Sequence, residues 1–308
     1  MINKIVAIQG NHPSKLNPIT DTSIFLANEI QSKKYKIFYY DPKDLSVINS
    51  KVIAKGFFIK FDYKRKKKFR ILKKQNLDLT KCKFILIRQD PPFNLEYVST
   101  TYILDIIKKK VKIINDPTSI RNISEKLYSA KYQKFMPNTI FTQNIDEIKK
   151  FFKLHKKIII KPIHGFSGND IYLRNKFNLR FIKKFIKKHD HIVCQKYLSK
   201  ISNGDKRVFL INGKVVGVIS RIPKKGTFLS NMSKGAKPIN TTLTKIEKKI
   251  SDLIAKDLKK ENIFFAGIDF IDQKLNGDIN VTSPTGLKTF YDLSKVNLAK
   301  TFWKELKA

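Results

Sequence analysis

Short apolar runs of β-forming residues alternate with segments of helical spacing, and this alternation constrains the fold more than any other feature of the chain. In the first part we expect strands and intervening helices at residues 4–9, 21–32, 36–40, 84–88, 97–109 and 111–114. Buried strands that alternate with helices are typical of an α/β protein, because each helix covers a face of the sheet. The first 115 or so residues are therefore expected to form a small open α/β lobe.

The pattern changes at Asp116, a good N-cap, with Pro117 at the first helical position of a helix expected to reach about residue 135. Asn212-Gly213 predicts a hairpin between strands 207–211 and 214–220. Residues 223–240 read as a long loop. The other expected elements, closed by a C-terminal helix, are 139–142, 145–155, 157–163, 171–174, 191–197, 244–260, 263–271 and 278–281.

The net charge of +38, from 63 basic and 25 acidic residues, raises the question of nucleic-acid binding. Only eight of the basic residues are Arg, the side chain that bases and phosphates favour, and the lysines are spread along the chain. The one dense run, Lys64–Lys68, is expected to be an exposed hairpin or connection. We therefore expect no specific nucleic-acid partner, but a general attraction for anionic substrates.

No apolar run reaches the roughly 20 residues of a membrane span, and the first residues do not resemble a secretory signal. Cys82 and Cys194 are the only cysteines and form no disulfide framework. These features favour a protein of the reducing cytoplasm with no membrane partner.

A candidate phosphate site follows the strand at 157–163, which carries Lys161 and leads into a loop with Gly165 and Gly168. Glycines after a strand let backbone amides approach an anion, and a lysine adds a positive charge. On these residues alone, an ordinary strand end and turn remain the alternative.

A candidate metal site comes from Asp269, inside an apolar strand, and from Asp278 and Asn280, whose spacing of two puts them on one face of a strand. Carboxylate and amide oxygens suit Mg²⁺. The alternative is a hairpin with polar residues facing water, which the apolar surroundings of Asp269 disfavour.

Three arginines lie at strand ends, Arg88 after a buried strand and Arg207 and Arg221 on either side of the Asn-Gly hairpin. In a lysine-rich chain, the planar guanidinium at such places indicates carboxylate binding. A surface ion pair is the alternative for Arg207 or Arg221 taken alone.

The chain resembles prokaryotic glutathione synthetases of the ATP-grasp superfamily, over nearly its whole length. The strings that carry the resemblance occur in the family's order and are Arg88-Gln89-Asp90-Pro91-Pro92-Phe93, Ser124-Glu125-Lys126-Leu127, Ile160-Lys161-Pro162, Gln195-Lys196-Tyr197-Leu198, Gly204-Asp205-Lys206-Arg207-Val208, Arg221-Ile222-Pro223 and Asp278-Ile279-Asn280-Val281-Thr282-Ser283-Pro284-Thr285. The resemblance implies an α/β protein with an ATP-grasp fold. It implies an N-terminal pre-ATP-grasp lobe at 1–120 and an ATP-grasp domain at 121–308, divided into a small ATP-binding lobe (121–198) and a large lobe (199–308).

The resemblance also implies the activity: ATP phosphorylates the cysteinyl carboxylate of γ-glutamylcysteine, and glycine then attacks the acyl phosphate to give glutathione. The implied cofactors are ATP and Mg²⁺, with Mn²⁺ as an alternative metal, and the implied assembly is a homotetramer. The residues implied for the metal are Asp269, Asp278 and Asn280. Those implied for ATP are Lys126, Lys161, Gly165, Gly168, Gln195, Tyr197, Leu198 and Asp205. Those implied for substrates and catalysis are Arg88, Ser283 and Thr285, with Arg207 and Arg221 stabilising charge during transfer.

Several positions depart from the family pattern. In the phosphate loop His164 stands in place of an acid and Ser167 in place of a glycine. Residues 223–237 are the expected lid, a loop that keeps water away from the acyl phosphate, and in it Leu229 and Ser230 replace the usual Arg and Gly. Asp278 is one methylene shorter than the usual metal-binding Glu. Two other readings therefore stay open: another ATP-grasp carboxylate–amine ligase or weakly active paralogue, and a non-catalytic basic protein that binds nucleic acid.

Overall fold

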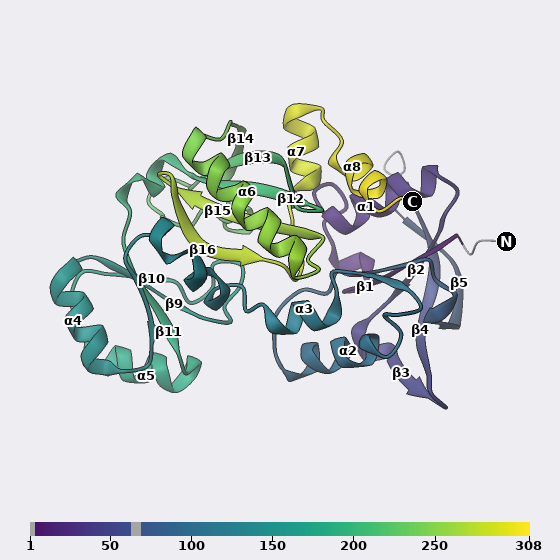
Figure 1. The fold of residues 1–308 in the computed structure, drawn as a ribbon, viewed down its shortest axis with the longest axis horizontal. Helices are drawn as coiled ribbons and strands as arrows, with labels where there is room; N and C mark the ends of the chain where they lie inside the picture. The colour runs from purple at the N-terminus through teal and green to yellow at the C-terminus, as the bar shows by residue number, and fades with distance from the viewer. Residues whose placement is uncertain (1–3, 63–68) are drawn as a thin grey trace.

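In the computed structural model, which describes residues 4–62 and 69–308, three β-sheets form the framework of the chain (Figure 1). The lysine-rich run Lys64–Lys68, expected to be a hairpin or connection, lies outside the described residues. Within them, no helix is long and apolar enough to cross a membrane.

The first sheet has the strand order β3-β4-β2-β1-β6-β7, with β5 paired to β4. Strands β1, β2, β6 and β7 are parallel, which suits the expected open α/β lobe, whereas β3, β4 and β5 add an antiparallel extension. The strands are β1 (Ile5–Gln9), β2 (Lys36–Tyr40), β3 (Leu45–Ile48), β4 (Lys51–Phe61), β5 (Phe69–Asp78), β6 (Phe84–Ile87) and β7 (Lys112–Ile114), and the helices of this part are α1 (Thr22–Ser32), α2 (Leu95–Asp105) and α3 (Pro117–Asn122).

The second sheet is antiparallel, in the order β10-β9-β11-β8, and lies with α4 and α5 at the end of the molecule opposite the chain termini (Figure 1). Ile158 and Ile160 of β9 face the two helices, in one core with Ile192 and Cys194 of β11. Because side chains alternate along a strand, the other face of β9 carries Lys161. The elements are β8 (Thr139–Thr142), α4 (Ile145–His155), β9 (Ile158–Pro162), β10 (Tyr172–Arg174), α5 (Leu179–His189) and β11 (Ile192–Lys196).

The third sheet is also antiparallel, in the order β14-β13-β12-β15-β16. Val208 and Leu210 of β12 pack against α6, and Phe209 and Ile211 pack on the opposite face with α7 and α8. The elements are β12 (Asp205–Ile211), β13 (Lys214–Ile222), β14 (Lys237–Asn240), α6 (Lys245–Lys260), β15 (Phe265–Ile271), β16 (Lys274–Asn280), α7 (Leu287–Ser294) and α8 (Leu298–Glu305).

The last two helices join the third sheet to the first. Helices α7 and α8 lie beside α1 (Figure 1), and their apolar residues share one core with β1, β2 and β6. Trp303 of α8 is fully buried there and donates its indole N–H to the carbonyl of Leu26 at 2.8 Å. The domain boundaries expected after residues 120 and 198 stay a prediction.

Three expected elements differ from the structure. The helix expected from 116 to about 135 ends at Asn122, and a 3₁₀ segment, Leu127–Phe135, follows it. The intervening Ile123 is extended, and the buried Lys126 directs its ammonium group to the carbonyl of Gly165. The loop expected at 223–240 contains β14, and the single C-terminal helix is two, because Lys295 takes a left-handed conformation.

Candidate active site

A cavity of about 660 Å³ lies between the second and third sheets, with loops of the first sheet at one end. It gathers nearly all the residues predicted from the sequence, which come from positions more than 150 apart in the chain. The predicted residues that line it are Lys126, Lys161, Gly165, Gly168, Gln195, Tyr197, Leu198, Asp205, Arg207, Arg221, Asp269, Asp278, Asn280, Ser283 and Thr285. The exception is Arg88, which is buried beside it.

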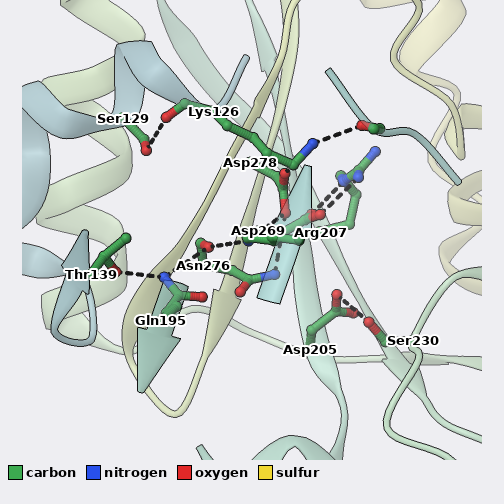
Figure 2. A network of polar contacts seen from close by, with 12 residues as sticks. Lys126, Ser129, Thr139, Gln195, Asp205, Arg207, Ser230, Asp269, Asn276 and Asp278 are labelled. Carbon is green, nitrogen blue, oxygen red and sulfur yellow. Dashed lines mark hydrogen bonds and ion pairs between the residues drawn. The ribbon is translucent and has the colours of Figure 1, made fainter. Parts of the chain in front are cut away.

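Asp278 lies between two lysines in the cavity, and Figure 2 labels one of them, Lys126. Its Oδ1 is 3.3 Å from the Nζ of Lys126, and its Oδ2 is 3.3 Å from the Nζ of Lys161. Burial alone would raise the pKa of Asp278, but the two ammonium groups outweigh it and hold that pKa well below the usual range. The carboxylate is therefore ionised at neutral pH.

A second cluster joins two aspartates to two arginines across β12, β13 and β15. Arg207 pairs with Asp269 through two hydrogen bonds, one of 2.8 Å from Nη2, and Arg221 lies 2.9 Å from the same carboxylate. Arg221 also donates to Asp205 from Nε at 2.8 Å. Burial would raise the pKa of Asp269, but the two guanidinium groups hold it below its usual range. The arginines predicted to bind substrate carboxylates thus bind protein carboxylates in this structure.

The buried side-chain oxygen of Asn280 accepts no hydrogen bond, which suits a cation ligand. Asn276, Asp278 and Asn280 alternate with the buried residues of β16, so they share the face that lines the cavity. Gly267 of β15 pairs with Asn280, next to an irregularity in the strand register that includes Asp269. Two carboxylates and one amide oxygen fit Mg²⁺, which binds few protein ligands when it also binds phosphate. In the described residues, no group of three or more His, Cys, Asp or Glu side chains offers an alternative.

The phosphate loop lies under the expected lid. Gly168 has a φ of +73°, and a Cβ at this position would lie 2.6 Å from the side-chain oxygen of Asn231 in the lid. Lys234 of the lid donates to the side-chain oxygen of Asn169 at 2.9 Å. The exposed His164 stacks on Phe93, with ring centroids 6.3 Å apart. The loop therefore contacts both the lid and the N-terminal part.

The end of the cavity beside β11 has an apolar wall suited to a flat ring. Ile159 and Ile271 line it together with Tyr197 and Leu198. Gln195 is held in place because its amide donates to Thr139 Oγ1 at 2.9 Å and to the carbonyl of Asn276 at 3.3 Å (Figure 2).

Arg88 is buried beside the opposite end, where its Nε donates to Ser23 at 3.0 Å and its Nη2 donates to the carbonyl of Pro284 at 2.9 Å. Its Nη1 is buried without a partner. Ser283 and Thr285 line the cavity on either side of Pro284. A buried cation with one free donor suits a substrate carboxylate.

Sequence reasoning assigned no role to Glu125, Asp21 or Asn276, which also line the cavity. Glu125 accepts a hydrogen bond from Thr282 Oγ1 at 2.8 Å, and burial raises its pKa. The only signal for Glu125 was its place directly before Lys126 in a family string. Asp21 caps α1, a structural role that its position before an apolar segment predicts equally well.

Comparison with known proteins matches both parts of the chain to one family. The family model for the prokaryotic glutathione synthetase N-terminal domain matches residues 5–121, and that for its ATP-grasp domain matches residues 125–295. Glutathione synthetase of Mesorhizobium japonicum is 34% identical over 303 residues, covering 97% of this chain and 96% of the relative. The enzyme of Buchnera aphidicola is 36% identical, covering 88% and 86%, and that of Escherichia coli is 33% identical, covering 89% of each.

Solved structures with low sequence identity share the ATP-grasp fold. D-alanyl-alanine synthetase A of Vibrio cholerae superposes with a TM-score of 0.64 at 16% identity and covers 100% of this chain and 98% of its own. The ATP-grasp ligase PsnB, in complex with a minimal precursor, has a TM-score of 0.62 at 11% identity and covers 98% and 99%.

Proposed function

The chain belongs to the prokaryotic glutathione synthetase family and is an ATP-dependent ligase that makes glutathione, and from this premise we propose which of its residues carry the reaction. The observation that carries the proposal is the single cavity that brings together Lys126, Lys161, Asp278 and Asn280. Two buried lysines, a carboxylate and an unpartnered amide oxygen are the groups that a nucleotide phosphate with its metal requires.

In the first step an oxygen of the cysteinyl carboxylate of γ-glutamylcysteine attacks the γ-phosphorus of ATP, and ADP leaves. In the second, the amine of glycine attacks the acyl carbon, phosphate leaves with the bonding electrons, and the nitrogen loses a proton to form the amide. Lys126 and Lys161 bind the phosphates, and Asp269, Asp278 and Asn280 would hold Mg²⁺. The metal supplies charge neutralisation on the transferring phosphoryl group.

The remaining predicted residues position the substrates. Backbone amides at Gly165 and Gly168 cover the phosphates, and Gln195, Tyr197 and Leu198 border the adenine. Asp205 holds Arg221 and the lid residue Ser230, whose hydroxyl donates to it at 2.6 Å. Arg88 binds a carboxylate of γ-glutamylcysteine, and Ser283 and Thr285 help to shape the site for the acceptor amine. Arg207 and Arg221 stabilise the negative charge that moves during transfer.

Finer properties extend the proposal. Mn²⁺ serves as an alternative to Mg²⁺ in the same site, because both metals bind oxygen ligands. The assembly is a homotetramer, and the cellular location is the cytoplasm, where the free thiols of the buried Cys82 and Cys194 stay reduced.

Phosphate release from ATP and Mg²⁺ tests the reaction, measured with γ-glutamylcysteine, with and without glycine, and with chromatographic detection of glutathione. Release that requires both substrates and yields glutathione supports the proposal. Release that requires the dipeptide but is indifferent to glycine favours a ligase with another acceptor amine, the reading that Leu229 in the lid motivates. No release with any combination contradicts the proposal.

A further inference from the structure

Every acidic residue proposed to hold the metal is already paired with a protein cation. Each oxygen of Asp278 lies 3.3 Å from the Nζ of a lysine, Lys126 on one side and Lys161 on the other. The carboxylate of Asp269 is bound by both Arg207 and Arg221. Of the three proposed ligands, only Asn280 has an unpartnered side-chain oxygen.

The two lysines have little freedom to leave Asp278. Their exposed fractions are 5% for Lys126 and 3% for Lys161, so both side chains are largely shielded from bulk water. Each also donates to a backbone carbonyl, Lys126 to Gly165 at 2.7 Å and Lys161 to Asn276 at 3.1 Å. These contacts hold both cations at the position that a metal ion bound to Asp278 would approach.

A divalent cation alone therefore meets an unfavourable field at Asp278. It would have to share one carboxylate with two buried ammonium groups, and repulsion between like charges is strong where water is scarce. A nucleotide has the opposite charge. Its phosphate oxygens give both lysines new acceptors and so release the carboxylate for the metal.

We propose that Lys126 and Lys161 block the metal site until nucleotide phosphate binds them, so that the divalent cation binds with or after the nucleotide and only weakly before it. This inference rests on the metal and phosphate sites of the proposed function. It gives the two lysines a second role: they exclude free divalent cations from the empty site.

Binding of Mn²⁺, followed by its electron paramagnetic resonance signal, tests the order without turnover. We expect the nucleotide-free protein to bind Mn²⁺ at least about tenfold more weakly than the protein saturated with ADP. We also expect Lys161→Met, and independently Lys126→Met, to strengthen Mn²⁺ binding about tenfold in the absence of nucleotide. The matched control is Lys196→Met, because the exposed Lys196 lines the same cavity and forms no ion pair with Asp278.

Asp278→Asn added to Lys161→Met should remove the gain, which separates the opened site from adventitious binding elsewhere. Equal Mn²⁺ affinity with and without ADP would overturn the inference and leave the ligase proposal intact. So would folded lysine variants without a gain. If Mn²⁺ fails to bind even with ADP, the metal site in the proposed function is wrong. If neither lysine variant folds, equally tight Mn²⁺ binding by the wild-type protein without ADP still overturns the inference.

Discussion

At the residue scale, buried polar atoms without a hydrogen-bond partner indicate where a ligand would bind at the cavity. Burying a polar group without a hydrogen bond costs about 1–3 kcal/mol, so folded proteins rarely retain one without a use. Arg88 and Asn280 each keep one such atom at the cavity, Nη1 in the first and Oδ1 in the second. Lys126 and Asp278, by contrast, satisfy each other. Removal of an unpartnered atom should therefore weaken ligand binding more than it lowers the free energy of unfolding.

Asn280→Ala tests this expectation at the proposed metal site. Because Oδ1 has no partner in the protein, we expect the free energy of unfolding to fall by only about 1 kcal/mol or less. The Mg²⁺ concentration for half-maximal activity should rise about tenfold or more. Asn240→Ala, whose amide binds the Leu293 carbonyl away from the cavity, is the control. A large loss of stability with unchanged Mg²⁺ dependence would show that Asn280 has a structural role only.

Arg88→Lys tests the proposed site for γ-glutamylcysteine. A lysine has no planar guanidinium to contact Ser23, Pro284 and a carboxylate at once. We expect KM for γ-glutamylcysteine to rise about tenfold or more, and KM for ATP to change by less than about twofold. Initial rates measured against each substrate in turn provide the values. A similar rise in both constants argues against this assignment.

At the element scale, the phosphate loop and the lid meet at positions where only small residues fit. Gly168 takes a left-handed φ of +73° directly beneath Asn231. Gly226 has a similar φ of +85°, but a Cβ there would have no heavy atom of the described residues within 4 Å. The two glycines therefore share the backbone cost of a side chain, but only Gly168 adds a collision with the neighbouring element.

Gly168→Ala should displace the Asn231 side chain of the lid from the loop, because a methyl group would lie 2.6 Å from the Asn231 oxygen. We expect KM for ATP to rise about tenfold, while Gly226→Ala changes it by less than about twofold. Both variants should lose a similar ~1 kcal/mol of stability. Equal kinetic effects would mean that the backbone conformation matters and the lid contact does not.

Asp105 joins α2 to α3 and gives a pH-dependent contribution to stability. Burial raises its pKa, but hydrogen bonds from Arg121, Thr118 and Lys108 outweigh this and lower the pKa below its usual value. Since the folded-state pKa is the lower one, the stabilisation is complete above the ordinary carboxyl pKa and is lost as pH falls through the folded-state value.

Asp105→Asn should therefore lower the free energy of unfolding by about 1–2 kcal/mol at pH 7, and the difference should shrink below about pH 4. Urea titrations at the two pH values measure it. Asp292→Asn is the control, because Asp292 pairs with Lys288 on an exposed helix turn and such pairs contribute little. A difference that grows on acidification would contradict the assigned direction of the pKa shift.

The sequence pattern predicted helices and strands well where the spacing of apolar residues matches the packing. It predicted them poorly where long-range contacts in the site determine the backbone. In β9, Ile158 and Ile160 face the helices and Lys161 faces the cavity. This alternation of side chains is what a strand covered by helices on one face requires. The region between Asn122 and Leu127 looks helical in sequence, but Lys126 is drawn to Gly165, a contact across 39 positions that no local pattern contains. Strand β14 was missed because its pairing with β13 is what orders it.

At the scale of the whole molecule, the first and third sheets share a hydrophobic core, whereas the second sheet has a separate one. One core joins β1, β2 and β6 to α7, α8 and β12, so the first and third sheets are packed together. The core of the second sheet is confined to its own strands and to α4 and α5. The pairs that make the site, such as Lys126 with Asp278, lie far apart in sequence. Only the family resemblance grouped them in advance, because composition and periodicity carry no such distances.

Hydrogen exchange should reveal this difference in packing. We expect amides of β8, β9 and β11 to exchange by local opening, about tenfold or more faster than those of β1 and β12, which should require global unfolding. ATP with Mg²⁺ should slow exchange in β9, because Lys161 and its neighbours contact the nucleotide in the proposed complex. Mass spectrometry of peptide fragments resolves the two regions. Uniform protection across both would show that the second sheet is not a separate unit.

The residues proposed to bind the nucleotide phosphates and those proposed to bind the other substrates come from different parts of the chain. Lys161 and Gly168 come from the second sheet and its loop, whereas Arg88 and Ser283 come from the packed pair formed by the first and third sheets. Part of the phosphate-binding machinery and the recognition of the substrates to be joined are therefore encoded in separate stretches of sequence, while the proposed metal ligands lie on the third sheet. Such a division lets evolution, or a protein engineer, change the substrates while the phosphate-binding second sheet is inherited unchanged.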